Sequence, residues 1–180
     1  RKDLGSAMRM PPMTHVKPDA LVLLEAGVRH WKCLLDVLVG VKPGGYVELP
    51  PKYKKYMKYV PPGGNWRQIP HDLVPDAMNG AFVAGGGRMG FYRRLSWFEP
   101  SPTLVTTPIM KGSMLIHPVE DRPLSVNDYK VIQGFPQDWE VPGPLSAEYR
   151  KIGEAVPPLL AYSVALGLKQ SLLDPGGVDL

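Results

Sequence analysis

Lysine alternates with tyrosine in a short run of this 180-residue chain, and arginines follow at several later positions. The run is Lys52-Tyr53-Lys54-Lys55-Tyr56-Met57-Lys58-Tyr59; Asn65-Trp66-Arg67 and then Arg88, Arg93 and Arg94 come after it. Cations attract phosphates, aromatic rings stack on bases, and arginine or asparagine can form paired hydrogen bonds with base edges. These residue types predict a nucleic-acid surface. An ordinary solvated basic face is the alternative for so short a run.

The charge of the chain is concentrated in the same region. The whole sequence has a net charge of +4, but residues 42–111 contain ten Lys or Arg against four Asp or Glu, which makes +6. The remaining residues carry a net −2. An anionic partner should therefore be attracted to the middle of the chain.

Other motifs that could carry chemistry are incomplete. Gly85–Gly90 matches G-x-G-x-x-G, but the helix and the acidic residue that a dinucleotide site requires do not follow it. A nucleotide-binding enzyme built on this glycine run is therefore a minor alternative. The four histidines are scattered without a metal-ligand spacing, so no metal site is expected. Cys33 follows Lys32 in a predicted apolar helix, where a buried thiol is expected rather than a nucleophile.

The elements that position these residues are predicted to form an α+β chain rich in loops, because it contains 19 glycines and 21 prolines. Leu21–Leu24 has the length of a strand, and apolar residues at helical spacing predict a helix over Arg29–Val39 that ends at Gly40. Frequent turn dipeptides over residues 42–90 predict a loop-rich subdomain with short strands.

Two helices are predicted in the second half of the chain. The first covers Asp121–Ile132, with Ser125 as N-cap, Asp128 three residues later and Gly134 as its end. The second begins at Pro157 or Pro158 and reaches about Leu173; it is apolar on nearly every side and should be buried against a larger body.

No segment is predicted to cross a membrane. The longest uncharged stretch near the C-terminus, residues 155–168, has 14 residues and two prolines, short of the roughly 20 apolar residues of a spanning helix. A single cysteine excludes an internal disulfide and fits a reducing compartment, so we expect a cytoplasmic protein of bacterial or phage origin.

Four segments of the second half, taken together, resemble the C-terminal part of the bacterial and phage DNA (cytosine-5) methyltransferases. They are Arg94–Leu104, His117–Ser125, Gln133–Pro136 and Tyr149–Pro158, which match the ninth motif, the joining segment and the tenth motif of that family in order. Val60–Arg67 and Ser96-Trp97 also resemble the family's target-recognition region. Even the opening residues 1–5 look like the end of the eighth motif, so the resemblance covers essentially the whole chain.

The resemblance implies a division of the chain into residues 1–95 (target recognition), 96–134 (ninth-motif hinge and joining helix) and 135–180 (tenth motif and a C-terminal helix that completes a Rossmann-like catalytic domain). Within Pro43–Arg94 it implies a surface that binds double-stranded DNA. Its candidate residues are Lys52, Lys54, Lys55 and Lys58 for the phosphates, and Asn65, Trp66, Arg67, Arg88, Arg93 and Arg94 for recognition.

The ninth and tenth motifs imply further roles. Ser96, Pro102 and Thr103 match residues that hold the recognition domain against the catalytic one. Gly153, Glu154, Ala155 and Val156 match the segment that helps to close the S-adenosylmethionine pocket, with Glu154 in place of the usual Asn. A carboxylate accepts a hydrogen bond but cannot donate one when ionised. Asp128 stands where the family usually has Glu.

Members of the family flip a cytosine out of the duplex, attack it with the cysteine of a Pro-Cys motif and methylate it from S-adenosylmethionine. The Pro-Cys, Glu-Asn-Val and cofactor glycine-loop motifs are not found in these 180 residues, and Cys33 follows a lysine, so no catalytic residue is assigned. We therefore expect the chain to be inactive alone and to need a catalytic partner, either a missing N-terminal region or a second subunit. The alternative is a stand-alone DNA-binding or regulatory module, which would fold its last helix back on its own domain.

Overall fold

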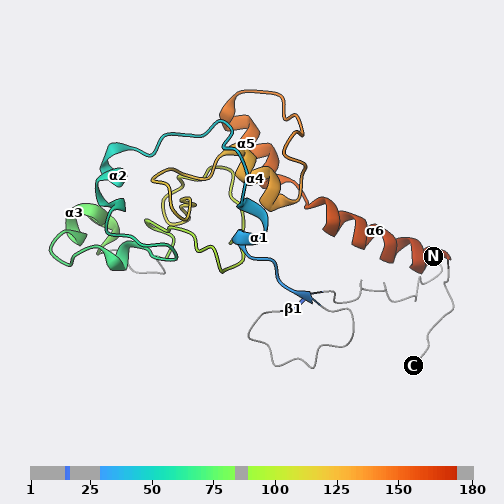
Figure 1. The fold of residues 1–180 in the computed structure, drawn as a ribbon, viewed down its shortest axis with the longest axis horizontal. Helices are drawn as coiled ribbons and strands as arrows, with labels where there is room; N and C mark the ends of the chain where they lie inside the picture. The colour runs from blue at the N-terminus through green and yellow to red at the C-terminus, as the bar shows by residue number, and fades with distance from the viewer. Residues whose placement is uncertain (1–14, 17–28, 84–88, 174–180) are drawn as a thin grey trace, which may run out of the picture. The chain divides into compact units, whose positions relative to one another are not determined.

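The computed structural model describes residues 15–16, 29–83 and 89–173 (Figure 1). The chain divides into two compact units: a larger unit of residues 32–155, and a smaller unit of residues 1–31 together with 156–180. The described part is mostly helix and loop, with little strand. Its elements are β1 (His15–Val16), β2 (Arg29–His30), α1 (Leu34–Leu38), α2 (Pro51–Met57), η1 (Trp66–Gln68), α3 (Val74–Met78), η2 (Asn79–Ala81), α4 (Val126–Gln133), α5 (Leu145–Glu154) and α6 (Pro158–Leu173).

Helix α2 provides one face of the first of two hydrophobic cores in the larger unit. Pro51 occupies its first turn, where the missing N–H of proline is harmless. Tyr53, Tyr56 and Met57 follow on one side of the helix and are buried. Both tyrosine rings meet the ring of Tyr92 edge-on, with centroids 5.4 and 5.9 Å apart. The first core consists of Leu49, Tyr53, Tyr56, Met57, Val60, Ile69, Val74, Ala77, Met78, Tyr92, Met114 and Ile116.

Helices α1, α4 and α5 surround the second core, and Figure 1 shows them grouped apart from α2 and α3. The rings of Tyr129 and Tyr149 meet edge-on at 4.8 Å. Gly153 allows α5 to approach the chain closely, because a Cβ there would lie 2.8 Å from the carbonyl oxygen of Val105. The second core consists of Leu34, Leu38, Leu95, Leu104, Leu115, Leu124, Val126, Tyr129, Tyr149 and Ile152.

An extended segment joins the two cores. Met114 and Ile116 lie in the first core and Leu115 lies in the second, as expected for an extended chain whose side chains alternate between two faces. This segment forms only isolated bridges with its neighbours. The short strands predicted over residues 42–90 are not confirmed: the described part of that segment contains α2, η1, α3 and η2 instead. The predicted strand Leu21–Leu24 lies outside the described residues.

Helix α4 confirms the cap and the end of the helix predicted over Asp121–Ile132, but the helix begins at Val126 instead of Asp121. The Ser125 hydroxyl accepts from the backbone N–H of Asp128 at 3.2 Å, and the Asp128 carboxylate accepts from the backbone N–H of Ser125 at 2.7 Å. Asp128 also forms a buried ion pair with Arg122 at 2.7 Å. Gly134 ends the helix in the left-handed region, at φ 86°.

The predicted helix over Arg29–Val39 is wrong in its first part. Arg29 and His30 form β2, which pairs in parallel with β1, and α1 covers only Leu34–Leu38. The cause is local: the carboxylate of Asp36 accepts from the backbone N–H of Cys33 at 2.8 Å, which makes Cys33 the N-cap. Cys33 is thus half-buried at a helix start, not buried within a helix as predicted.

Helix α6 of the smaller unit confirms the predicted bounds of the last helix but not its burial in this chain. Only Gly167 is buried, and several large apolar side chains are exposed: Leu159, Leu160, Tyr162, Leu166, Leu168, Leu172 and Leu173. No helix within the described ranges has both the length and the apolar character that crossing a membrane requires.

Candidate nucleic-acid interface

The lysines of α2, and the lysine directly after this helix, face solvent, whereas two tyrosines of the helix are buried. Lys52, Lys54, Lys55 and Lys58 are exposed, whereas Tyr53 and Tyr56 belong to the first core. The ammonium groups of Lys52, Lys55 and Lys58 each lie 4.9 Å from the ring centroid of the tyrosine that follows in sequence. The run therefore presents a row of cations, but its two buried tyrosines have no free face on which a base could stack.

One of these lysines is already paired with a carboxylate. The Nζ atom of Lys55 lies 3.1 Å from Oδ2 of Asp76, and the same oxygen accepts a short hydrogen bond from the hydroxyl of Tyr56. The Tyr56 hydroxyl and Lys55 lower the pKa of Asp76, and hydrogen bonds with Tyr56 and Asp76 raise the pKa of Lys55. Asp76 thus offsets part of the positive charge that Lys55 would offer to a phosphate.

The segment Asn65-Trp66-Arg67 forms the start of η1. Asn65 is buried and caps this turn: its Oδ1 accepts from the backbone N–H of Arg67 at 3.1 Å, and its own N–H donates to Oε1 of Gln68 at 2.7 Å. The indole N–H of Trp66 is buried without a hydrogen-bond partner among the described residues. Arg67 is exposed, and its guanidinium carbon lies 5.8 Å from the centroid of the Trp66 ring. Of the three, Arg67 is the one placed to meet a ligand.

Arg94 lies in the interior of the larger unit, although the sequence placed it on the recognition surface. Its side chain is 5% exposed and pairs with the carboxylate of Asp121. Its Nε donates to the carbonyl of Val60 at 2.7 Å and its Nη2 to that of Met57 at 3.3 Å. Its Nη1 donates to the carbonyls of His117, Val119 and Glu120, at 3.3, 3.1 and 3.2 Å. Arg94 therefore links the end of α2 to the turn of residues 117–121 through hydrogen bonds. All the nitrogens of its guanidinium already donate within the protein, so none is free to contact a base.

Arg93, next in the chain, has a different environment. It is half-buried, and its Nε donates to the carbonyl of Met114 at 3.0 Å. Burial lowers the pKa of Arg93, yet an arginine stays protonated at neutral pH. Arg88, the remaining candidate of the recognition set, lies outside the described residues.

A hollow of about 370 Å³ lies beside Arg93. It is lined by Gly63, Asn65, Met89, Arg93, Arg94, Leu95, Ser96, Glu99, Pro100 and Pro102. It thus brings together Asn65, Arg93 and Ser96, which come from the recognition and ninth-motif segments of the sequence. Its arginine, hydroxyl and carboxylate groups could hydrogen-bond to a polar ligand edge.

The turn that Arg94 contacts is itself organised by His117. The Nδ1 atom of this buried imidazole accepts from the backbone N–H groups of Val119 and Glu120, at 3.3 and 3.1 Å. Its ring meets Trp97 edge-on. Burial, together with the positive charges of Arg122 and Arg94, lowers the pKa of His117, against the opposite influence of Glu120 and Asp128.

We expect the pKa of His117 to make the larger unit less stable in mild acid. A histidine whose pKa in the folded state lies below 6.5 takes up a proton more readily in the unfolded state. The contribution of His117 to the free energy of unfolding is therefore fully present above pH 6.5 and is lost as the pH falls toward its pKa in the folded state. Protonated Nδ1 also cannot accept the two turn hydrogen bonds. Urea unfolding between about pH 7.5 and pH 5 measures this loss. His117→Asn keeps an acceptor at this position and removes the titration, so its stability should be flatter over that range; an unchanged slope would count against the assignment.

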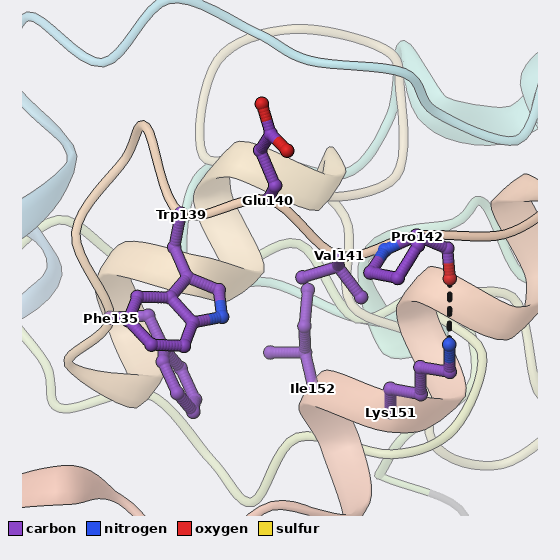
Figure 2. A pocket seen from close by; sticks show the side chains of 7 residues that line it. All are labelled: Phe135, Trp139, Glu140, Val141, Pro142, Lys151 and Ile152. Carbon is purple, nitrogen blue, oxygen red and sulfur yellow. Dashed lines mark hydrogen bonds between the residues drawn. The ribbon is translucent and has the colours of Figure 1, made fainter.

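The structure also contains an apolar hollow that sequence reasoning missed. It has about 200 Å³ and is lined by Phe135, Trp139, Glu140, Val141, Pro142, Lys151 and Ile152 (Figure 2). In Figure 2 the Trp139 ring lies beside Phe135, at 5.9 Å between centroids, while the carboxylate of Glu140 points away. Lys151 donates to the carbonyl of Pro142 at 2.6 Å. The signal that the sequence offered for this feature was a tryptophan close to several prolines.

No cluster of three or more His, Cys, Asp or Glu residues that could hold a metal ion occurs in the described part of the chain. Cys33 lies at the start of α1, and its thiol donates to Oδ2 of Asp36 at 3.2 Å. The exposed lysines suit electrostatic binding of an anion.

Sequence comparison relates this chain to a known protein family. The family model described as C-5 cytosine-specific DNA methylase matches residues 64–170. This chain belongs to that family. The type II methyltransferase M.Eco47II of Escherichia coli is 46% identical over 115 residues, which is 64% of this chain and 28% of the relative. M.Sau96I of Staphylococcus aureus is 44% identical over 117 residues, 65% of this chain and 27% of the relative.

A plant relative matches more distantly: DNA (cytosine-5)-methyltransferase 3 of Arabidopsis thaliana is 34% identical over 124 residues, 62% of this chain and 9% of the relative. The chain spans less than a third of the length of the bacterial relatives. Methyltransferases of restriction-modification systems are thus its relatives. The family uses S-adenosylmethionine as the methyl donor and acts on double-stranded DNA.

Residues 153–156, which the resemblance assigned to the cofactor pocket, lie at the end of α5 and directly after it. Gly153 and Ala155 have structural roles here: Gly153 allows the close approach of α5, and the Ala155 carbonyl accepts from Nε2 of Gln133. Glu154, at the last turn of α5, and Val156 are exposed. Neither the hollow beside Arg93 nor the apolar hollow of Figure 2 is lined by any of these four residues.

Proposed function

We propose that this chain is the DNA-recognition and C-terminal portion of a cytosine-5 DNA methyltransferase that acts on a flipped cytosine in duplex DNA. In this proposal Lys52, Lys54 and Lys58 contact the phosphates, and Arg67 and Arg93 contribute to recognition. The observation that carries this proposal is the row of exposed lysines on α2 in a chain of the methylase family. The tyrosines of the same helix are buried in the first core, which leaves the lysines facing solvent. Arg94 is left out because its guanidinium is used internally.

The proposal keeps three functional segments: residues 1–95 for target recognition, 96–134 as a hinge with the joining helix, and 135–180 as the tenth motif and final helix. Arg94 supports the hinge, because it bonds both the end of α2 and the turn of residues 117–121. In the complete enzyme, α6 would complete a Rossmann-like catalytic domain. The exposed apolar side chains of α6 support a partner surface of this kind.

The residues of this chain would bind and orient the DNA and the cofactor and would not take part in the reaction itself. Phosphate contacts by the lysines fix the position of the duplex, and base contacts by Arg67 and Arg93 select its sequence. Glu154, with the backbone of Gly153–Val156, would hold one edge of S-adenosylmethionine, which supplies the methyl group when bound. The nucleophile and most of the cofactor pocket belong to the catalytic part that this chain needs.

The ion pair of Lys55 allows a sharp test of the phosphate contacts. Lys54→Ala should weaken binding to duplexes of any sequence and reduce the slope of log K against log salt by about one unit. Lys55→Ala should change the slope by clearly less, because Asp76 already offsets the charge of Lys55. Fluorescence anisotropy over a salt series measures both. Equal slopes for the wild-type and Lys54→Ala chains would exclude Lys54 as a phosphate contact.

The second candidate function is a stand-alone DNA-binding or regulatory module. It would use the same basic surface but would need no catalytic partner, so its last helix should be covered by its own domain. The match of residues 64–170 to the cytosine-specific DNA methylase family favours the methyltransferase portion.

A further inference from the structure

The turn after α3 contains the dipeptide Asn79-Gly80 in an unusual conformation. Asn79 has φ 48° and ψ −139°, a combination that residues with a side chain rarely adopt and that resembles the first central residue of a type II′ turn. Both residues are exposed, and nothing lies within 4 Å of a Cβ built on Gly80. The dipeptide is therefore open to water and free of steric hindrance around Gly80.

This ψ value brings the backbone nitrogen of Gly80 toward the side chain of Asn79. In an L residue, Cβ lies about 120° from the backbone nitrogen around the Cα–C axis, so a ψ near −120° aligns the next nitrogen with Cβ. At −139° the Gly80 nitrogen is only about 20° from that alignment. Helical ψ values turn the next nitrogen well away from Cβ. Asn127 lies within helix α4, so it is not arranged in this way.

We infer that Asn79 is a site of spontaneous deamidation. The Gly80 nitrogen attacks Cγ of Asn79, a new N–Cγ bond closes a five-membered succinimide, and the Cγ–Nδ2 bond breaks. Nδ2 leaves as ammonia and takes the proton that the Gly80 amide loses. Water then opens the ring at either carbonyl, which gives aspartate or isoaspartate. No oxidant, reductant or enzyme is required.

The new carboxylate would appear beside two of the basic residues. Asn79 and Gly80 line a hollow of about 210 Å³ together with Lys52, Tyr53, Lys111 and four further residues. A negative charge there would lower the positive potential next to the lysines of α2. Deamidation would therefore weaken the binding of DNA. This consequence rests on the proposed function, whereas the chemical step does not.

Peptide mapping by mass spectrometry tests the chemical step. The chain has three asparagines, Asn65, Asn79 and Asn127, so two serve as internal references. During incubation of the folded 180-residue chain at mildly alkaline pH, residue 79 should gain about 1 Da and yield isoaspartate, faster than the other two. Gly80→Ala is sterically tolerated and should slow the change about tenfold, because a Cβ crowds the attacking nitrogen. Modification of Asn79 no faster than Asn127, or at an unchanged rate in Gly80→Ala, would overturn the inference.

A binding experiment tests the consequence separately. Asn79→Asp should bind duplex DNA about two- to threefold more weakly than the wild-type chain at low salt, with a smaller difference at high salt. Equal affinities at low salt would overturn the link to DNA. If neither chain bound DNA, the proposed function would fail, while the mass measurement would still decide the chemical step.

Discussion

Replacement of Arg94 with methionine is expected to lower the free energy of unfolding of the larger unit by about 3–5 kcal/mol. The guanidinium donates to five backbone carbonyls and pairs with Asp121 from a side chain that is 5% exposed. Methionine has a similar length but no donor, so these carbonyls would lose their partner in the interior. Urea unfolding monitored by circular dichroism measures the change.

Arg93→Met is the matched control, because it removes the same group one residue earlier. Arg93 is half-buried and makes one hydrogen bond, from Nε to the carbonyl of Met114, so its loss should cost about 1 kcal/mol. Arg93→Met should instead weaken the sequence preference of DNA binding if Arg93 contributes to recognition. Similar destabilisation by the two substitutions would show that the contacts of Arg94 do not support the end of α2.

The neighbouring arginines illustrate what the sequence could not reveal. Arg93 and Arg94 are the same residue type, and no local pattern distinguishes them. Their different roles depend on carbonyls more than 20 residues away in the chain, which only the folded structure brings together. The same holds for the Lys/Tyr run, where Tyr92 covers the tyrosines from a distant segment.

Elements with local signals were predictable. Ser125, Asp128 and Gly134 define α4 through contacts within a few residues, and the proline pair 157–158 marks the start of α6. Helix α5 was missed although Leu145, Tyr149 and Ile152 recur at helical spacing. Its start at Pro144-Leu145 lacks a side-chain cap, which removes the usual signal for a helix beginning.

Restoration of methyl transfer by a second chain is the other large effect that we expect. The sequence contains no Pro-Cys dipeptide, and in our proposal residues 153–156 hold only one edge of the cofactor. A chain carrying the family's glycine loop, Pro-Cys and Glu-Asn-Val motifs should supply both. Assembly should depend on the exposed apolar residues of α6, because their burial against the partner would remove apolar surface from water.

The matched variants separate assembly from DNA binding. Leu159→Glu with Leu172→Glu on α6 should prevent restoration of methyl transfer while the isolated chain binds duplex DNA as before, since α6 lies in the smaller unit and α2 in the larger. Lys52→Ala with Lys54→Ala should do the reverse: the two chains should still assemble, but with weaker DNA binding. Assembly that survives the two glutamates would show that α6 does not contact the partner.

The central claim is that this chain holds the DNA while another part of the enzyme performs the reaction. Incorporation of tritiated methyl groups from S-adenosylmethionine into duplex DNA tests it most directly. We predict no incorporation by the 180-residue chain alone, none by the catalytic chain alone, and methylation of cytosine at C5 when the two are mixed. Methylation by the isolated 180-residue chain would contradict the claim.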